Sequence, residues 1–122
     1  EMKDVVQAAA TGNERAQLAI DAFVESVRHY IGAYLAVLNG IDALVFTGGI
    51  GQHGHEIRQA VCAELQFAGV DLDQQKNKTI KGSEESRIDT GKGVEIWVLP
   101  TNEEIIVARQ TMEVLSRIQQ NA

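Results

Sequence analysis

Cysteine, basic charge and long apolar runs are scarce in this 122-residue chain, and each scarcity excludes a class of protein. The single cysteine, Cys62, rules out a framework of intrachain disulfides, and a buried structural thiol is its simplest interpretation. Acidic residues outnumber basic ones by 17 to 11, and the net charge of −6 argues against a nucleic-acid-binding surface. No apolar run approaches the roughly 20 residues of a membrane span, and no signal-peptide pattern is present. We therefore expect a cytoplasmic protein that binds neither nucleic acid nor a membrane.

Apolar residues at helical spacing are what the chain has in plenty. They predict a long helix over about residues 12–38, which a capping box between Thr11 and Glu14 would open and Asn39-Gly40 would end. Its apolar stripe runs the whole length and needs more partner surface than so small a chain offers. The chain also does not begin with methionine. We therefore expect a piece of a larger protein, or a chain that associates with a second copy.

The remaining apolar runs alternate between strand and helix patterns. Residues 43–46 predict a buried parallel strand, residues 55–67 a helix, residues 94–99 a second strand, and about residues 102–118 a last helix. Residues 70–78 have no clear period and predict no element. The order helix, strand, helix, strand, helix indicates an α/β unit with right-handed crossovers.

A glycine-rich turn at residues 47–54, TGGIGQHG, joins the first strand to the next helix. From Gly49 it fits the pattern G-x-G-x-x-G. Glycine permits positive φ and leaves room for a ligand to approach the backbone, while the amides at a helix start favour phosphate. The turn therefore favours a phosphorylated ligand, although glycines that serve only tight strand-to-helix packing would produce the same pattern.

Two kinds of nucleotide site fit such a turn. A dinucleotide (NAD) site needs an acidic residue about 20 positions later, at the end of a second parallel strand. Asp71 and Asp73 have that spacing, but residues 70–73 are too short and polar for such a strand, so we interpret this match as coincidental. The other is a mononucleotide cradle, in which a hydrophobic strand ends in Gly-Gly, as Val45 to Gly49 do.

Two separated motifs make the interpretation specific. Residues 46–51, FTGGIG, resemble the FTGGIGEN signature of acetate kinases and of the related propionate and butyrate kinases. Residues 100–109, PTNEEIIVAR, resemble the PTNEELxIAR segment near the C-terminus of that family. Residues 13–16 and 30–34 also match the long helix of the family. The resemblance covers essentially the whole chain, in order and at matching spacing.

The resemblance implies an actin-like ATPase fold, of which residues 1–122 would form the C-terminal, nucleotide-binding part. It implies transfer of the γ-phosphoryl group of ATP, with Mg²⁺, to acetate, propionate or a similar short carboxylate, in a homodimer. The substrate-binding arginines and the catalytic histidine of the family have no counterpart here, so we expect no catalytic residue in this segment and weak nucleotide binding without activity. A non-catalytic oligomerisation module and an NAD-binding half-domain remain the alternatives.

The resemblance also assigns site residues. Eight positions in two segments match those that contact the nucleotide in the family: Glu1, Met2, Lys3, Gly49, Ile50, Gly51, Gln52 and His53. Four of them depart from the usual residue. Glu1 stands for Asp and Lys3 for Arg, whereas Gln52 stands for Glu and His53 for Asn. His29 and His55 have no assigned role and are expected to be structural or exposed.

Glu103 matches the magnesium-associated glutamate of the family. A single carboxylate suits Mg²⁺, which keeps most of its waters, whereas an acidic residue in the first turn of a helix is also favoured by the helix dipole alone. We expect Glu103 to approach Mg²⁺ and assign Glu104 to a capping box with Thr101.

Overall fold

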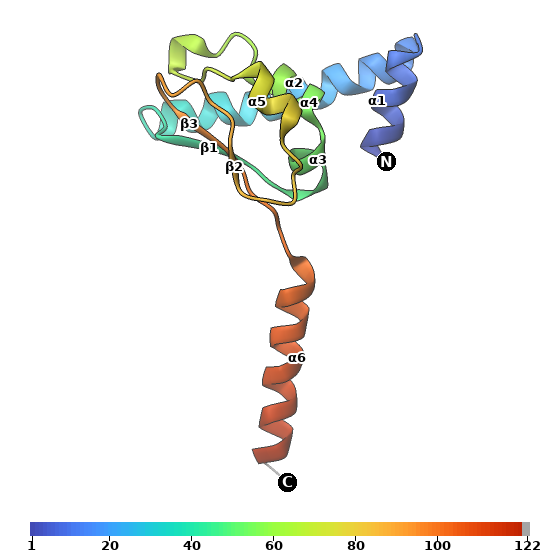
Figure 1. Ribbon diagram of the computed structural model, residues 1–122, viewed down its shortest axis with the longest axis vertical. Coiled ribbons are helices and arrows are strands. Elements are labelled where there is room, and N and C mark those ends of the chain that lie inside the picture. The colour runs from blue at the N-terminus through green and yellow to red at the C-terminus, as the bar shows by residue number, and fades with distance from the viewer. Residues whose placement is uncertain (121–122) are drawn as a thin grey trace.

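A computed structural model describes residues 1–120 as a folded body from which one long helix projects (Figure 1). The helices are α1 (Met2–Ala10), α2 (Glu14–Val37), α3 (Gly48–His53), α4 (His55–Cys62), the 3₁₀ helix η1 (Gln66–Ala68), α5 (Gln74–Thr79) and α6 (Glu103–Gln120). The strands are β1 (Ala43–Phe46), β2 (Ser86–Arg87) and β3 (Glu95–Val98). Within residues 1–120, no helix combines the length and the apolar character that crossing a membrane requires.

The sheet has three strands in the order β1-β3-β2. β1 and β3 are parallel, with Ala43 opposite Glu95 and Phe46 opposite Val98, while β2 is antiparallel to β3. β3 is therefore the central strand, and Val98 is fully buried. β1 was expected to be buried, but it lies at an edge and Val45 is 47% exposed. The expectation failed because an apolar run does not reveal how many of its faces are covered.

Two apolar clusters hold the body together. One lies around the sheet and includes Cys62, which is buried as expected, with Ile88 and Ile96. The other joins α4 to the two N-terminal helices through Ile57, Val61 and Val24. Since α1 and α2 pack against each other, this second cluster fixes the start of the chain against α4, which follows the glycine-rich segment.

The helix starts are set by different residues from those expected. The cap of α2 is Asn13, whose side chain accepts a hydrogen bond from the Ala16 amide at 3.1 Å, so the capping box predicted at Thr11 is wrong. The end of α2 is as predicted, because Asn39 and Gly40 both have positive φ. α1 was not predicted, although Met2, Val5, Val6 and Ala9 are at helical spacing.

The middle of the chain differs most from the sequence expectation. The helix predicted over residues 55–67 ends at Cys62, because Ala63 has an extended ψ of 137° and Glu64 a left-handed φ of 58°, neither of which an α-helix can contain. Residues 70–78, for which no element was predicted, contain all of α5 except its last residue, Thr79. Its cap is Asp73, whose carboxylate accepts from the Gln75 and Lys76 amides, both at 3.0 Å.

Candidate functional site

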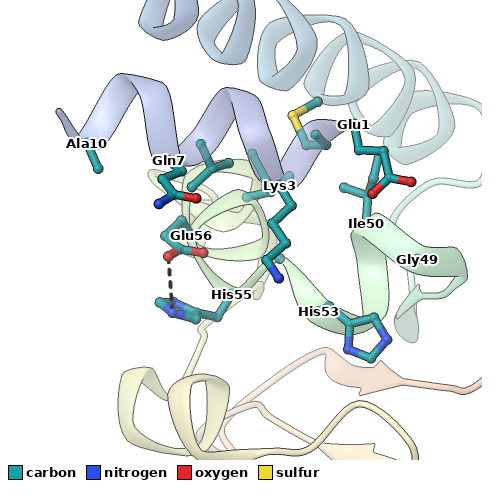
Figure 2. Close-up of a pocket in the computed structure, with 13 residues that line it drawn as sticks. Glu1, Lys3, Gln7, Ala10, Gly49, Ile50, His53, His55 and Glu56 are labelled. Atoms are coloured by element: carbon teal, nitrogen blue, oxygen red, sulfur yellow. Dashed lines mark ion pairs between the residues drawn. The ribbon is translucent and has the colours of Figure 1, made fainter. Parts of the chain in front are cut away.

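A cavity of about 980 Å³ lies between α1, α3 and α4 (Figure 2). Its wall is built from the start of the chain and from residues about fifty positions later. The residues that line it are Glu1, Met2, Lys3, Val6, Gln7, Ala10, Gly49, Ile50, His53, Gly54, His55, Glu56 and Ile57. The volume falls at the upper end of the roughly 300–1,000 Å³ typical of small-molecule sites.

One wall comes from α1, whose residues divide by chemistry. Met2 and Val6 pack into the apolar cluster around Val24 and Ile57, whereas the longer polar side chains of Lys3 and Gln7 stand one helical turn apart over the opening (Figure 2). Glu1 is the N-cap of this helix. The α1 wall therefore offers an apolar floor with an amine, an amide and a carboxylate above it.

The opposite wall is α3, which replaces most of the turn expected at residues 47–54. Gly48 opens it with a φ of +71°, a conformation that side chains with a Cβ rarely adopt. A Cβ at Gly49 would meet nothing within 4 Å, so this glycine leaves open space beside the cavity. Ile50 and His53, three residues apart on the helix, face the same cavity (Figure 2).

Gly51 and Gln52 do not line this cavity. A Cβ at Gly51 would lie 3.1 Å from the Phe46 carbonyl carbon, so this glycine permits the close approach of α3 to β1. The Gln52 amide is hydrogen-bonded to the Thr101 hydroxyl at 3.0 Å and so ties α3 to the segment before α6. Close packing of α3 on β1 and open space beside the cavity, the two features that the glycine pattern left open, therefore belong to different glycines, Gly51 and Gly49.

A second, smaller hollow of about 410 Å³ opens on the other side of α3, over the end of β1. Gly48 and Gly51 line it together with apolar residues of α2 such as Phe23 and Val27. Gly49 and Ile50 line both spaces. Within the described residues, α3 is thus a thin partition with its small residues turned toward two openings.

His55 is a cavity residue to which the sequence assigned no role. His55 was expected to be structural or exposed, but it lines the cavity, and its Nε2 lies 3.2 Å from Glu56 Oε1 (Figure 2). Its Nδ1 is buried without a hydrogen-bond partner among residues 1–120. A histidine two positions after His53, at the start of a helix, was the sequence signal that both would lie near one opening.

Glu103 lies outside both spaces. It begins α6, which leads away from the body (Figure 1). The helix is capped by Asn102, whose side-chain oxygen accepts from the Ile105 amide at 3.1 Å, so the capping box predicted between Thr101 and Glu104 is wrong. Within residues 1–120, no group of three or more His, Cys, Asp or Glu residues is arranged to hold a metal ion.

Comparison with known proteins adds the family to this geometry. A sequence profile described as the acetokinase family matches residues 1–109. An acetate kinase of Dictyoglomus thermophilum is 48% identical over 118 residues, which are 96% of this chain and 29% of the relative. An acetate kinase of Syntrophomonas wolfei is 44% identical over 111 residues, which are 91% of this chain and 28% of the relative. The chain thus spans 28–29% of the length of these curated relatives.

Solved structures agree with the sequence matches. The acetate kinase of Porphyromonas gingivalis superposes with a TM-score of 0.82 at 36% identity, covering 94% of this chain and 29% of the other. A propionate kinase of Francisella tularensis superposes with a TM-score of 0.76 at 38% identity, covering 88% of this chain and 27% of the other. The arrangement of most of this chain is therefore also found within the longer chains of these two kinase structures.

Proposed function

Because this chain belongs to the acetokinase family, we propose that it is the C-terminal, nucleotide-binding part of an acetate kinase. Its fold is part of an actin-like ATPase domain, as in the acetate kinase structures that it matches. The proposed reaction of the whole enzyme is transfer of the γ-phosphoryl group of ATP to acetate, propionate or a similar short carboxylate. The products are an acyl phosphate and ADP.

One observation carries this proposal: the cavity brings together the two segments that family resemblance assigns to the nucleotide. Glu1 to Lys3 lie at the start of α1, and Gly49, Ile50 and His53 lie on α3, yet all line one space (Figure 2). Apolar walls with a few polar groups are typical of sites for small molecules. In this proposal the apolar side holds the base, while the Lys3 amine and the His53 ring donate hydrogen bonds to ribose or phosphate oxygens.

The proposed role is binding and orientation rather than chemistry. Phosphoryl transfer requires positive charge around the moving group. Among the residues that line the cavity, the one Lys or Arg residue is Lys3, on the exposed surface of α1. We therefore propose that the 122-residue chain binds ADP or ATP weakly and has no kinase activity alone.

Mg²⁺ would enter this site on the nucleotide phosphates. When bound, it neutralises the charge that develops on those oxygens. Glu103 remains the residue that we propose to approach it, directly or through water, because the Gln52–Thr101 hydrogen bond ties the chain just before Glu103 to α3. The test is Mg²⁺ dependence: Glu103→Gln is expected to weaken Mg-ADP binding but not binding of ADP without metal, and equal loss in both would contradict the role.

The cavity itself is tested best at Gly49. Valine at this position meets no protein atom near its Cβ, so the chain should still fold, but the side chain would occupy the space of the ligand. Gly32, an exposed glycine of α2 that also has open space around it, provides the matched control. Isothermal titration with Mg-ADP should give heat for the wild type and for Gly32→Val, and none for Gly49→Val.

The contrary outcome is equally clear. The absence of heat with wild type, together with an unchanged melting temperature at millimolar Mg-ADP, would contradict the nucleotide site. Competition between NAD and ADP provides a further control, and preferential binding of NAD would favour the dinucleotide alternative over a kinase.

We also propose a homodimer in the cytoplasm as the state of the whole enzyme. Exposed apolar residues on α2 support the dimer, since Tyr30 and Tyr34 stand one turn apart and are 68% and 60% exposed. Light scattering would measure the mass directly. A monomer at all concentrations would contradict this part of the proposal and leave the nucleotide site untouched.

A further inference from the structure

Arg58 is a buried cation that the proposed reaction does not use. We propose that Arg58, held by Asn77, is a positioning residue that fixes α3 in the form that lines the cavity. This inference rests on the proposed function for its ligand, but the arrangement that it describes can be measured without one. Arg58 does not line the large cavity, although it lines the smaller hollow, and it acts on the large cavity through α3.

The guanidinium of Arg58 binds the end of α3 directly. Its Nη1 donates to the carbonyl oxygens of Gly51 at 2.7 Å and Gln52 at 3.0 Å. These carbonyls belong to the last turn of a six-residue helix, where no further turn supplies amide donors. A cation at this end also complements the helix dipole. Arg58 therefore donates to α3 the hydrogen bonds that the amides of a further helical turn would supply in a longer helix.

Asn77 holds the other side of the same guanidinium. Arg58 Nε donates to Asn77 Oδ1 at 2.7 Å, and Nη2 donates to the Asn77 carbonyl oxygen at 3.0 Å. The Asn77 amide in turn donates to the His55 carbonyl oxygen at 2.9 Å. Both side chains are buried, Arg58 to 2% exposure and Asn77 to none. The planar fork of arginine is thus locked between α5 and α3, a geometry that lysine cannot reproduce.

The charge on Arg58 is balanced by dipoles rather than by an acid. Within residues 1–120, no carboxylate forms an ion pair with it. Desolvation by burial lowers the pKa of the guanidinium, which remains protonated. Burying a cation among neutral groups costs stability, so a purely structural role would be served as well by an apolar residue. What an apolar residue cannot do is hold two carbonyls of α3.

The consequence for the cavity follows from the short span of α3. Gly51 and Gln52 lie between Ile50 and His53, the two residues of α3 whose side chains face the ligand space. A shift of the Gly51 and Gln52 carbonyls therefore moves both of them. Because this backbone is already fixed, ligand binding does not lose the conformational entropy of ordering it.

The test compares two arginines that perform the same task at different helices. Arg28 donates from Nη1 to the carbonyl oxygens of Val61, at 3.0 Å, and Ala63, at the end of α4 and away from α3. We expect Arg58→Met to weaken Mg-ADP binding at least about tenfold, equivalent to about 1.4 kcal/mol. Arg28→Met should lower the melting temperature while leaving Kd unchanged, measured by titration well below each melting temperature.

Arg58→Lys keeps the charge and guards against a variant that does not fold. Because lysine cannot bridge the carbonyls of α3 and Asn77 together, binding should still weaken, by less than in Arg58→Met. If Arg58→Lys and Arg58→Met, both folded, bind Mg-ADP as wild type does, the positioning role is overturned.

Amide hydrogen exchange gives a readout that needs no nucleotide. The Gly54 amide donates to the Ile50 carbonyl oxygen at 2.9 Å and reports closure of α3. Exchange at residues 52–54 should accelerate in both Arg58 variants and not in Arg28→Met. Equal exchange in all variants would overturn the inference even if the wild type bound no nucleotide, a result that would separately remove the proposed function. Faster exchange with no binding by the wild type would support the positioning of α3 alone.

Discussion

The body of the molecule and α6 have similar apolar patterns, but the apolar residues are buried in the body and exposed in α6. In the body, Ile88, Ile96 and Val98 are completely buried. In α6, Ile106 and Ile118 are 56% and 60% exposed, and no residue of the helix is buried. Figure 1 shows the cause, since α6 extends away from the sheet and the other helices. Periodicity therefore indicates that a face is apolar, but the fold decides whether that face has a partner.

The two regions also differ in how they are held. Body elements are joined by long-range bonds, such as that from the Leu99 amide to the Phe46 carbonyl oxygen at 2.9 Å. The hydrogen bonds of α6 are local, for example from Arg117 to Glu113 one turn earlier. Local bonds and helix propensity stabilise an isolated helix only marginally. Substitutions should therefore act cooperatively in the body and locally in α6.

The largest expected effect is that of Ile96→Ala in β3. Ile96 is fully buried, so truncation removes apolar contacts and leaves a cavity, which should lower the free energy of unfolding by about 2–5 kcal/mol. Urea unfolding followed by the fluorescence of Trp97, the only tryptophan, measures it. A loss below about 0.5 kcal/mol would mean that the sheet is not the centre of the core.

Asp89→Asn comes next. The Asp89 carboxylate is 2% exposed and accepts four hydrogen bonds, from Arg87 Nε and Nη2 and from the Gly91 and Ile96 amides. Asparagine accepts at only one side-chain atom, so the loss should be about 1–3 kcal/mol near pH 7.

The same substitution has a pH signature. The Arg87 hydrogen bond lowers the pKa of Asp89 in the folded chain. Its stabilisation is therefore complete above the unfolded pKa of about 3.9 and disappears as the pH falls toward the folded value. Unfolding at about pH 7, 5 and 3 should show a shallower acid loss for Asp89→Asn than for wild type, and parallel profiles would contradict the assignment.

A smaller, local effect is expected at the cap of α6. Asn102→Ala removes the hydrogen bond to the Ile105 amide, a change worth about 0.5–2 kcal/mol to a helix. Helical circular dichroism should decrease while the urea midpoint of Trp97 fluorescence stays the same. A shifted midpoint would show that α6 contributes to the cooperative unit and would break the comparison between the two regions.

The smallest effect belongs to the apolar face of α6. Ile106→Ala changes a side chain that is more than half exposed, so the free energy of unfolding should change by less than about 0.5 kcal/mol. The matched comparison is Ile96→Ala in the same assay. If Ile106→Ala were as destabilising as Ile96→Ala, α6 would have a partner in solution, and light scattering would show whether that partner is a second copy.

The strongly periodic parts of the fold could be predicted from the sequence. The long helix α2, the parallel pairing of β1 with β3, and α6 follow from apolar spacing and from Asn39-Gly40. The short elements could not. α5 is polar and contains one buried residue, Asn77. The break after Cys62 depends on the backbone angles of Ala63 and Glu64, which no nearby residue type predicts.

The candidate site also contains residues that could be predicted from the sequence and residues that could not. The resemblance singled out Lys3 as well as Gly49, Ile50 and His53, and the tertiary structure brings these residues to one cavity (Figure 2). Arg58 could not be predicted at all, because its partner Asn77 lies 19 residues away and arginine on a helix is usually exposed. Arg58 also binds backbone carbonyl oxygens, and because every residue has one, the sequence does not show which of them it binds.

The buried thiol of Cys62 makes it possible to measure how often α4 opens. Burial raises its pKa to about 12, so at neutral pH the reactive thiolate is almost absent while α4 stays in place. An alkylating reagent would modify the chain only during openings that detach α4 from the sheet. Because the chain has one cysteine, each modified molecule records one such event. The rate of labelling would thus measure how often α4, whose first turn carries Arg58, detaches from the sheet.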